Sequence, residues 1–105
     1  MLSARGECKT PGGKLIAVEF DVMNDELRNV VVSGDFFLYP EEALPLLVTA
    51  LEHSSTSLGV ADYAARAREA IESRAELVGS SPEALATAVV RALQQQPSAD
   101  RDDVG

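Results

Sequence analysis

Two alternating runs of apolar residues, joined by three turn-forming residues, constrain the fold of this chain more than any other feature. The first run spans residues 15–23 and the second spans residues 27–33. Apolar side chains occupy every second position of the first run, which is the period of a β-strand. The link 24–26, Asn-Asp-Glu, is typical of a β-hairpin. Because a two-stranded ribbon is only marginally stable alone, helices must cover its apolar face.

Three later segments have the signals of helices. The first helix is expected to start at Pro40, or near Glu42 because Pro45 is tolerated only in a first turn, and apolar residues then recur at helical spacing to residue 51. A second helix is expected from about Val60, with Gly79 in the position that follows its end. A third starts at Ser81-Pro82, with Ser as N-cap and Pro in the first turn. These signals predict an α+β fold, a small antiparallel sheet packed against about three helices.

The segment after the hairpin leaves two structural possibilities open. Gly34 interrupts the second strand, and residues 35–39 follow it with three of the five aromatic side chains. This segment either adds a third strand to the sheet or places its phenylalanines beneath the helices. Aromatic residues make up only 5% of the chain. We therefore expect Phe36 and Phe37 to be largely buried where the sheet meets the helices.

The length of 105 residues is that of one domain. Residues 1–8 are polar without a clear period and are predicted to be a leader, ahead of a single domain at residues 9–96. Residues 97–105 are polar and are predicted to be a disordered tail.

The charge and the cysteine content exclude several classes of protein. A formal net charge of −8 repels phosphate backbones and anionic lipids, so neither a nucleic acid nor a membrane is expected as a partner. No apolar run approaches the roughly 20 residues of a membrane span, and the N-terminus lacks the apolar region of a signal peptide. A single cysteine, Cys8, fits a reducing compartment. We therefore expect a cytoplasmic protein.

No catalytic residue and no metal site can be assigned. His53 is the only histidine, at the end of a predicted helix, where an exposed imidazole is common. One cysteine and one histidine fall short of the ligand set of structural zinc. Gly12-Gly13 is not a phosphate-binding loop, because no strand precedes it and no Gly-Lys-Ser/Thr follows. The chain alone is expected to be non-catalytic.

Two short segments are more specific than the fold requires. The first, residues 9–14, has two glycines after a proline and a lysine at each end, and the second, residues 34–37, is Gly-Asp-Phe-Phe. Both have simpler explanations. The first can be a strand-entry turn with surface lysines, and the second can be a bulge glycine, a turn aspartate and two core aromatics. Our hypothesis is that residues 9–14 and the Gly34–Asp35 turn form one partner-facing edge, with Lys14 as the main contact, unless Lys14 only solvates a strand end. The candidate site residues are Lys9, Pro11, Gly12, Gly13, Lys14, Gly34 and Asp35.

Taken together, these segments resemble a known family. Residues 9–16 (KTPGGKLI), 34–42 (GDFFLYPEE) and 75–83 (AELVGSSPE) are similar in order and spacing to the C-terminal domain of lipoate–protein ligases. The resemblance covers roughly residues 9–93. Gly-Asp-Phe-Phe followed by Pro-Glu is its most specific motif. The family implies a fold related to the sulfur-transfer and iron–sulfur scaffold proteins.

The resemblance also implies a function. This domain can be a separate accessory subunit, an arrangement that suits a chain starting at Met1, and it forms a heterodimer with a lipoate–protein ligase catalytic subunit. Lipoate and ATP give lipoyl-AMP, and the lipoyl group then passes to a lysine of an acceptor protein. The resemblance implies that the accessory chain is required for the adenylation step and binds no cofactor itself, and that lipoate and ATP with Mg²⁺ bind to the catalytic subunit.

Two other functions remain open. The related fold makes the chain a candidate iron–sulfur or sulfur-transfer scaffold, but such proteins need thiolates and this chain has only Cys8. A non-catalytic interaction module is the second alternative.

Overall fold

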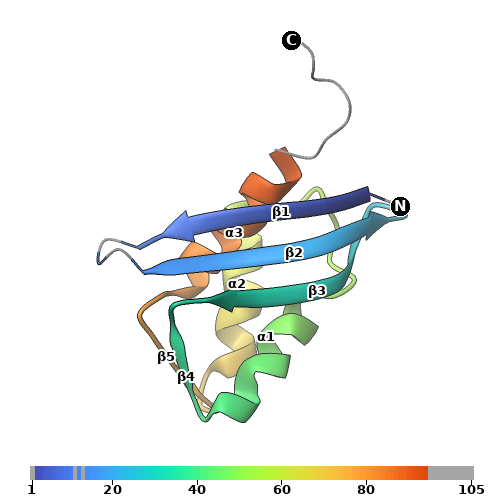
Figure 1. Cartoon of the computed structure of the whole chain (residues 1–105). Coiled ribbons are helices and arrows are strands. Elements are labelled where there is room, and N and C mark those ends of the chain that lie inside the picture. The colour runs from blue at the N-terminus through green and yellow to red at the C-terminus, as the bar shows by residue number, and fades with distance from the viewer. Residues whose placement is uncertain (1, 11, 13, 95–105) are drawn as a thin grey trace.

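The fold is α+β, as the sequence predicts, in a computed structural model that describes residues 2–10, 12 and 14–94. Within these residues a three-stranded antiparallel sheet has the order β1-β2-β3, and a separate two-stranded sheet pairs β4 with β5 (Figure 1). The elements in chain order are β1 (Leu2–Lys9), β2 (Leu15–Met23), β3 (Glu26–Gly34), β4 (Phe37–Tyr39), the 3₁₀ turn η1 (Glu41–Ala43), α1 (Leu44–Leu51), α2 (Val60–Ile71), β5 (Glu76–Val78) and α3 (Pro82–Gln94).

The three α-helices cover one face of the three-stranded sheet (Figure 1). Helix α3 packs under β1 and β2, α1 packs beside β3, and α2 lies between the two helices. The core between the layers is mostly aliphatic, as an aromatic-poor composition requires, with two aromatic side chains among its members. Its largest fully buried side chains are Tyr63, Phe20, Ile16, Leu27, Leu47, Leu51, Leu85, Val18 and Val89. No helix of the described residues is long and apolar enough to cross a membrane.

The predicted hairpin is confirmed as β2 and β3. Met23 pairs with Glu26, so the connection is a two-residue turn, and Asn24 and Asp25 both have positive φ. Positive φ at both central positions matches the right-handed twist of the strands. Glycine tolerates positive φ most readily, and Asn and Asp come next.

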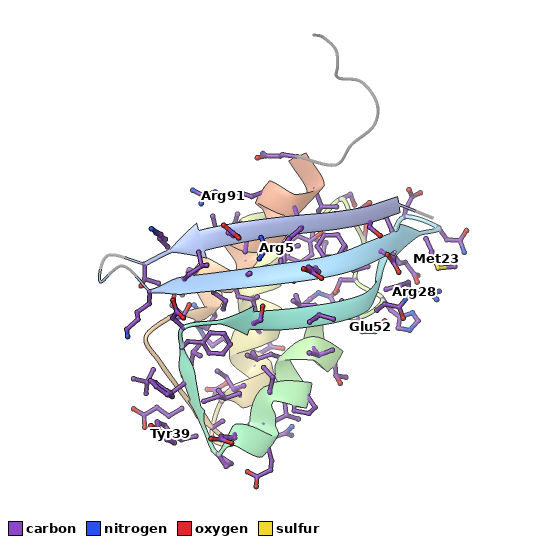
Figure 2. The ribbon with its side chains drawn as sticks, viewed as in Figure 1. Arg5, Met23, Arg28, Tyr39, Glu52 and Arg91 are labelled. Carbon is purple, nitrogen blue, oxygen red and sulfur yellow. The ribbon has the colours of Figure 1, made fainter. Side chains whose placement is uncertain are left out.

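A bulge in β3 changes the register of the hairpin. Between the pairs Glu19–Val31 and Asp21–Arg28, β3 carries one residue more than β2. The two N–H groups of the bulge, those of residues 29 and 30, donate to the carboxylate of Glu52 over 2.8 and 3.1 Å. Glu52 follows α1 and lies at the edge of β3 (Figure 2). It therefore ties the end of α1 to the sheet and satisfies two donors that the bulge leaves without strand partners.

The predicted leader is wrong, because residues 2–9 form the edge strand β1 and pair along β2 from Leu2–Val22 to Lys9–Leu15. Ala4 and Gly6 are buried against the helix layer, and Cys8 is half-buried beside them. Their small side chains let α3 come close, while the intervening residues are charged and exposed. Arg91 of α3 donates to the carbonyl oxygen of Glu7 over 3.0 Å. The predicted tail, residues 97–105, lies outside the described residues.

The helix starts match the sequence signals. Residues 41–43 form one 3₁₀ turn, and α1 then begins at Leu44 with Pro45 in its first turn, where the missing N–H costs nothing. At α3 the Ser81 hydroxyl accepts from the N–H of Ala84 over 3.0 Å, which caps the helix.

The predicted end of the second helix is wrong. Helix α2 stops at Ile71, and Ser73 takes the positive φ that ends it. The N–H groups of Arg74 and Ala75 then both donate to the carbonyl oxygen of Ile71, each over 2.9 Å. Gly79 has a positive φ of 90°, but it follows β5 and not a helix.

The burial predicted for the two phenylalanines is only half right. Phe36 is half-buried and packs against the core, whereas Phe37 is 57% exposed. Residues 37–39 do form a strand, but it pairs with β5 and leaves the main sheet. Side chains alternate on β4, so Leu38 takes the buried position and Phe37 points outward.

Candidate functional site

The structure brings the two predicted site segments together. Gly12, Lys14, Gly34 and Asp35 line one surface hollow of about 480 Å³, which Phe36 and Phe37 complete. We call this the turn-side hollow. It lies where the β1–β2 connection meets the segment leaving β3, at the end of the sheet beside β4 and β5 (Figure 1).

Gly34 fixes how closely these segments approach. Its φ of +146° is outside the range of ordinary L-residues, and an added Cβ would lie 2.2 Å from the carbonyl oxygen of Leu15. The next residue, Asp35, donates its N–H to the same carbonyl over 2.7 Å. Glycine is therefore required for the chain to turn off the sheet while staying against the start of β2.

A third segment, residues 79–81, joins the same edge. Gly79, Ser80 and Ser81 line a neighbouring hollow of about 370 Å³ with Thr10, Gly12 and Lys14. The Thr10 hydroxyl lies 3.4 Å from the carbonyl oxygen of Gly79, and a Cβ added at Gly79 would lie 3.7 Å from Cγ of Lys14. The hydrocarbon stem of Lys14 thus runs over Gly79. The sequence places Gly79 at the end of one predicted helix and Ser81 at the start of the next, and neither signal indicates that this segment lies beside Lys14.

The charged side chains of this edge face solvent. Lys14 and Asp35 are exposed on the turn-side hollow, and Thr10 closes the turn by donating its N–H to the carbonyl oxygen of Lys14 over 2.8 Å. Lys9 is also exposed, at the end of β1, but it does not line the hollow. The predicted site residues Pro11 and Gly13 lie outside the described residues.

The chemistry available at this edge is that of binding. Its side chains supply an ammonium group, a carboxylate, hydroxyl groups and two aromatic rings. In the part of the chain that the structure describes, no group of three or more His, Cys, Asp or Glu side chains could hold a metal ion. Cys8 is half-buried, with its thiol 3.8 Å from the carbonyl oxygen of Lys9. This position gives the thiol little of the exposure that sulfur transfer requires.

The titratable groups with shifted pKa values serve the fold. A hydrogen bond with His53 is the main cause that lowers the pKa of Glu26, and Nδ1 of His53 lies 3.3 Å from its carboxylate. Burial raises the pKa of Tyr63, whose hydroxyl donates to the carbonyl oxygen of Ser55 over 2.6 Å. Both groups hold the loop after α1 against its neighbours, away from the turn-side hollow.

Comparison with known proteins gives one informative match. No protein-family model and no curated protein matches the chain. Among solved structures, the chain is similar to one chain of a structure described as an archaeal lipoylation system, a bipartite lipoate protein ligase and its E2 lipoyl domain from Thermoplasma acidophilum. The TM-score is 0.63 and the identity 26%, over 85% of this chain and 94% of that chain. In fold and in sequence, this chain is therefore similar to a chain of a bipartite lipoate protein ligase system.

Proposed function

We propose that this chain is the accessory subunit of a two-component lipoate–protein ligase in the cytoplasm. With the catalytic subunit it supports lipoate adenylation, in which lipoate and ATP give lipoyl-AMP and pyrophosphate. The lipoyl group then passes to a lysine of an acceptor protein. The similarity to a chain of a solved bipartite ligase system is the observation that carries this proposal, because it extends over nearly the whole of that chain.

The geometry of the candidate site supports a role in binding. A ligase that forms a mixed anhydride must exclude water from it, and a second domain can assist by ordering loops or covering the site. The turn-side hollow is suited to such contact because backbone hydrogen bonds hold the two segments that line it. Gly34 holds one segment within hydrogen-bonding distance of β2, and the Thr10 turn holds the other.

Lys14 is the contact that we propose at this edge. Its stem packs over Gly79, so the ammonium group is displayed with less freedom than on an isolated surface lysine. In a chain of net charge −8, a cation at this position is available to a carboxylate or phosphate of the partner complex.

The test is binding of the chain to the catalytic subunit, followed by calorimetry, with Lys14→Ala compared against Arg66→Ala. Both variants remove one exposed cation, but Arg66 lies on α2, among residues of α1 and α2. Both should unfold like the parent within about 0.5 kcal/mol. Lys14→Ala should bind more weakly and Arg66→Ala should not. Equal affinities of the two variants would remove Lys14 from the site, and failure of the parent to bind would overturn the proposed function.

A further inference from the structure

The small β4–β5 sheet displays an apolar outer face. Phe37 and Tyr39 of β4 are each 57% exposed, and Val78 of β5 is 39% exposed. Phe37 and Val78 are paired across the two strands, so all three side chains lie on one side. Leu38 occupies the opposite side and is buried. We call Phe37, Tyr39 and Val78 the aromatic patch; Figure 2 shows Tyr39 at the margin of the molecule beside β4.

The two rings of the patch stack on each other. Their centroids lie 6.3 Å apart with an angle of 17° between the ring planes, which is a stacked pair. The chain contains only five aromatic residues, and Phe20 and Tyr63 fill the core. Two of the remaining three are thus exposed to solvent, although burying them would have stabilised the fold. Rigid, preorganised aromatic side chains are typical of the residues that dominate the binding energy of protein interfaces.

Carboxylates surround the aromatic patch. Glu76 is paired with Tyr39 across the strands, Asp35 precedes β4, and Glu41 and Glu42 follow it. All four are exposed, and none forms an ion pair with another described residue. The patch is therefore an apolar centre with an acidic rim, in which the four carboxylates outnumber the ammonium group of Lys14 on the side of the turn-side hollow.

The aromatic patch is continuous with the turn-side hollow. Phe37 lines that hollow together with Lys14 and Asp35. It also lines a second hollow of about 460 Å³, which extends over Phe36 and Leu44 toward α1. One docked surface can thus cover the hollows and the rings together.

The charge of the acidic rim indicates which kind of partner binds the patch. Two copies of this chain meeting through it would bring eight carboxylates together, and an anionic lipid surface would be repelled in the same way. We infer that the aromatic patch docks on the ligase catalytic subunit, at an apolar surface rimmed by Lys and Arg side chains. This inference rests on the proposed function and extends its contact surface from the turn-side hollow to β4 and β5.

The first test removes the apolar centre. The double variant Phe37→Ala/Tyr39→Ala and the single variant Val78→Thr are titrated against the catalytic subunit by calorimetry. Val31→Thr is the matched control, because Val31 is 53% exposed on β3, outside the patch. The double variant should bind roughly ten-fold or more weakly. Val78→Thr should lose several-fold, and Val31→Thr should bind like the parent.

The second test reverses the charge of part of the acidic rim without changing a residue of β4 or β5. Glu41→Lys/Glu42→Lys is compared with Glu69→Lys/Glu72→Lys, which changes the net charge equally on exposed positions in and just after α2. The rim variant should bind more weakly at low salt and lose the salt dependence of the parent, whereas the α2 variant should keep most of it. Because η1 lies outside the β4–β5 sheet, these two charge-reversal variants test whether the patch binds the catalytic subunit even if the aromatic variants fold poorly.

Together these outcomes distinguish failure of the inference from failure of the proposed function. If patch and rim variants bind like their controls while the parent binds well, the inference is wrong and the proposed function stands. If the parent does not bind the catalytic subunit, both fail. Sedimentation that shows a parent dimer and a monomeric double variant would identify a second copy as the occupant, and binding to anionic vesicles would identify a lipid surface. Either result overturns the inference.

Discussion

Replacing Gly6 by alanine tests the structural assignment of β1 most sharply. Gly6 is buried, pairs with Val18 of β2, and faces α3. A Cβ at this position would lie 2.1 Å from the carbonyl oxygen of Ala88 and 2.6 Å from the nitrogen of Ala92. Both atoms belong to the backbone of α3, so no side-chain rotation can relieve the overlap.

The expected destabilisation follows from this geometry. Cβ atoms essentially never approach other atoms to less than 3.0 Å, so the 2.1 Å contact requires α3 and β1 to separate by roughly 1 Å. Separation opens gaps around Leu85 and Val89, which are fully buried on α3. Overpacking of this kind costs about 1–3 kcal/mol, partly offset by about 0.4–1 kcal/mol from the stiffer unfolded chain. We expect a net loss of about 1–2 kcal/mol.

Urea unfolding followed by circular dichroism measures this loss, and Gly12→Ala is the matched control. A Cβ at Gly12 meets nothing within 4 Å, so that variant should unfold like the parent. Gly6→Ala should also lower Tm by about 4–8 °C for each kcal/mol lost. If both variants had the same free energy of unfolding as the parent, Gly6 would not lie against α3 and the assignment of β1 would be refuted.

Three further predictions concern the loop after α1. Glu52→Ala removes the acceptor of two N–H groups in the β3 bulge and should lower the free energy of unfolding in urea by about 1–3 kcal/mol. Tyr63→Phe removes the hydrogen bond to Ser55 and should cost about 1 kcal/mol at neutral pH. Because burial raises the pKa of Tyr63 in the folded state, the parent should lose stability as the pH rises above about 10, and Tyr63→Phe should lose less in the same titration. The hydrogen bond with His53 lowers the pKa of folded Glu26 below its ordinary value of 4.5, so its stabilisation is present above about pH 4.5 and is lost as the pH falls below it. Glu26→Gln should therefore flatten the acid unfolding curve in that pH range.

Local patterns predicted the elements whose signals are strong. The alternation of Ile16, Val18 and Phe20 identified β2, and Asn24-Asp25 identified its turn. Strand β1 was missed because its inward residues are Ala4, Gly6 and Cys8, whose small side chains give little hydropathy contrast with their neighbours. Alternation of small and charged residues is nevertheless the period of a strand.

The errors after residue 71 have a different cause. Ser73 ends α2 with a positive φ, a position that glycine usually occupies, so the sequence pattern predicts a helix that continues to Gly79 and does not predict β5. Without β5, nothing indicated that β4 would pair outside the main sheet. The outward position of Phe37 depends on that long-range pairing and could not be read from local sequence.

More of the candidate site than of the surface around it could be predicted from the sequence. Gly12, Lys14, Gly34 and Asp35 were selected as two separate segments, and the structure places them around one hollow. The participation of Gly79 and the exposure of the aromatic patch both depend on tertiary packing. Whether any of these residues contacts a partner stays a prediction.

Lipoate-dependent ATP–pyrophosphate exchange is the decisive assay for the proposed accessory role in lipoate adenylation. The catalytic subunit, this chain and the mixture of both are assayed separately, with lipoate omitted as the control. We predict exchange by the mixture, little by the catalytic subunit alone, and none by this chain alone. Full exchange by the catalytic subunit without this chain, or exchange by this chain by itself, would show that the chain is not a non-catalytic accessory subunit.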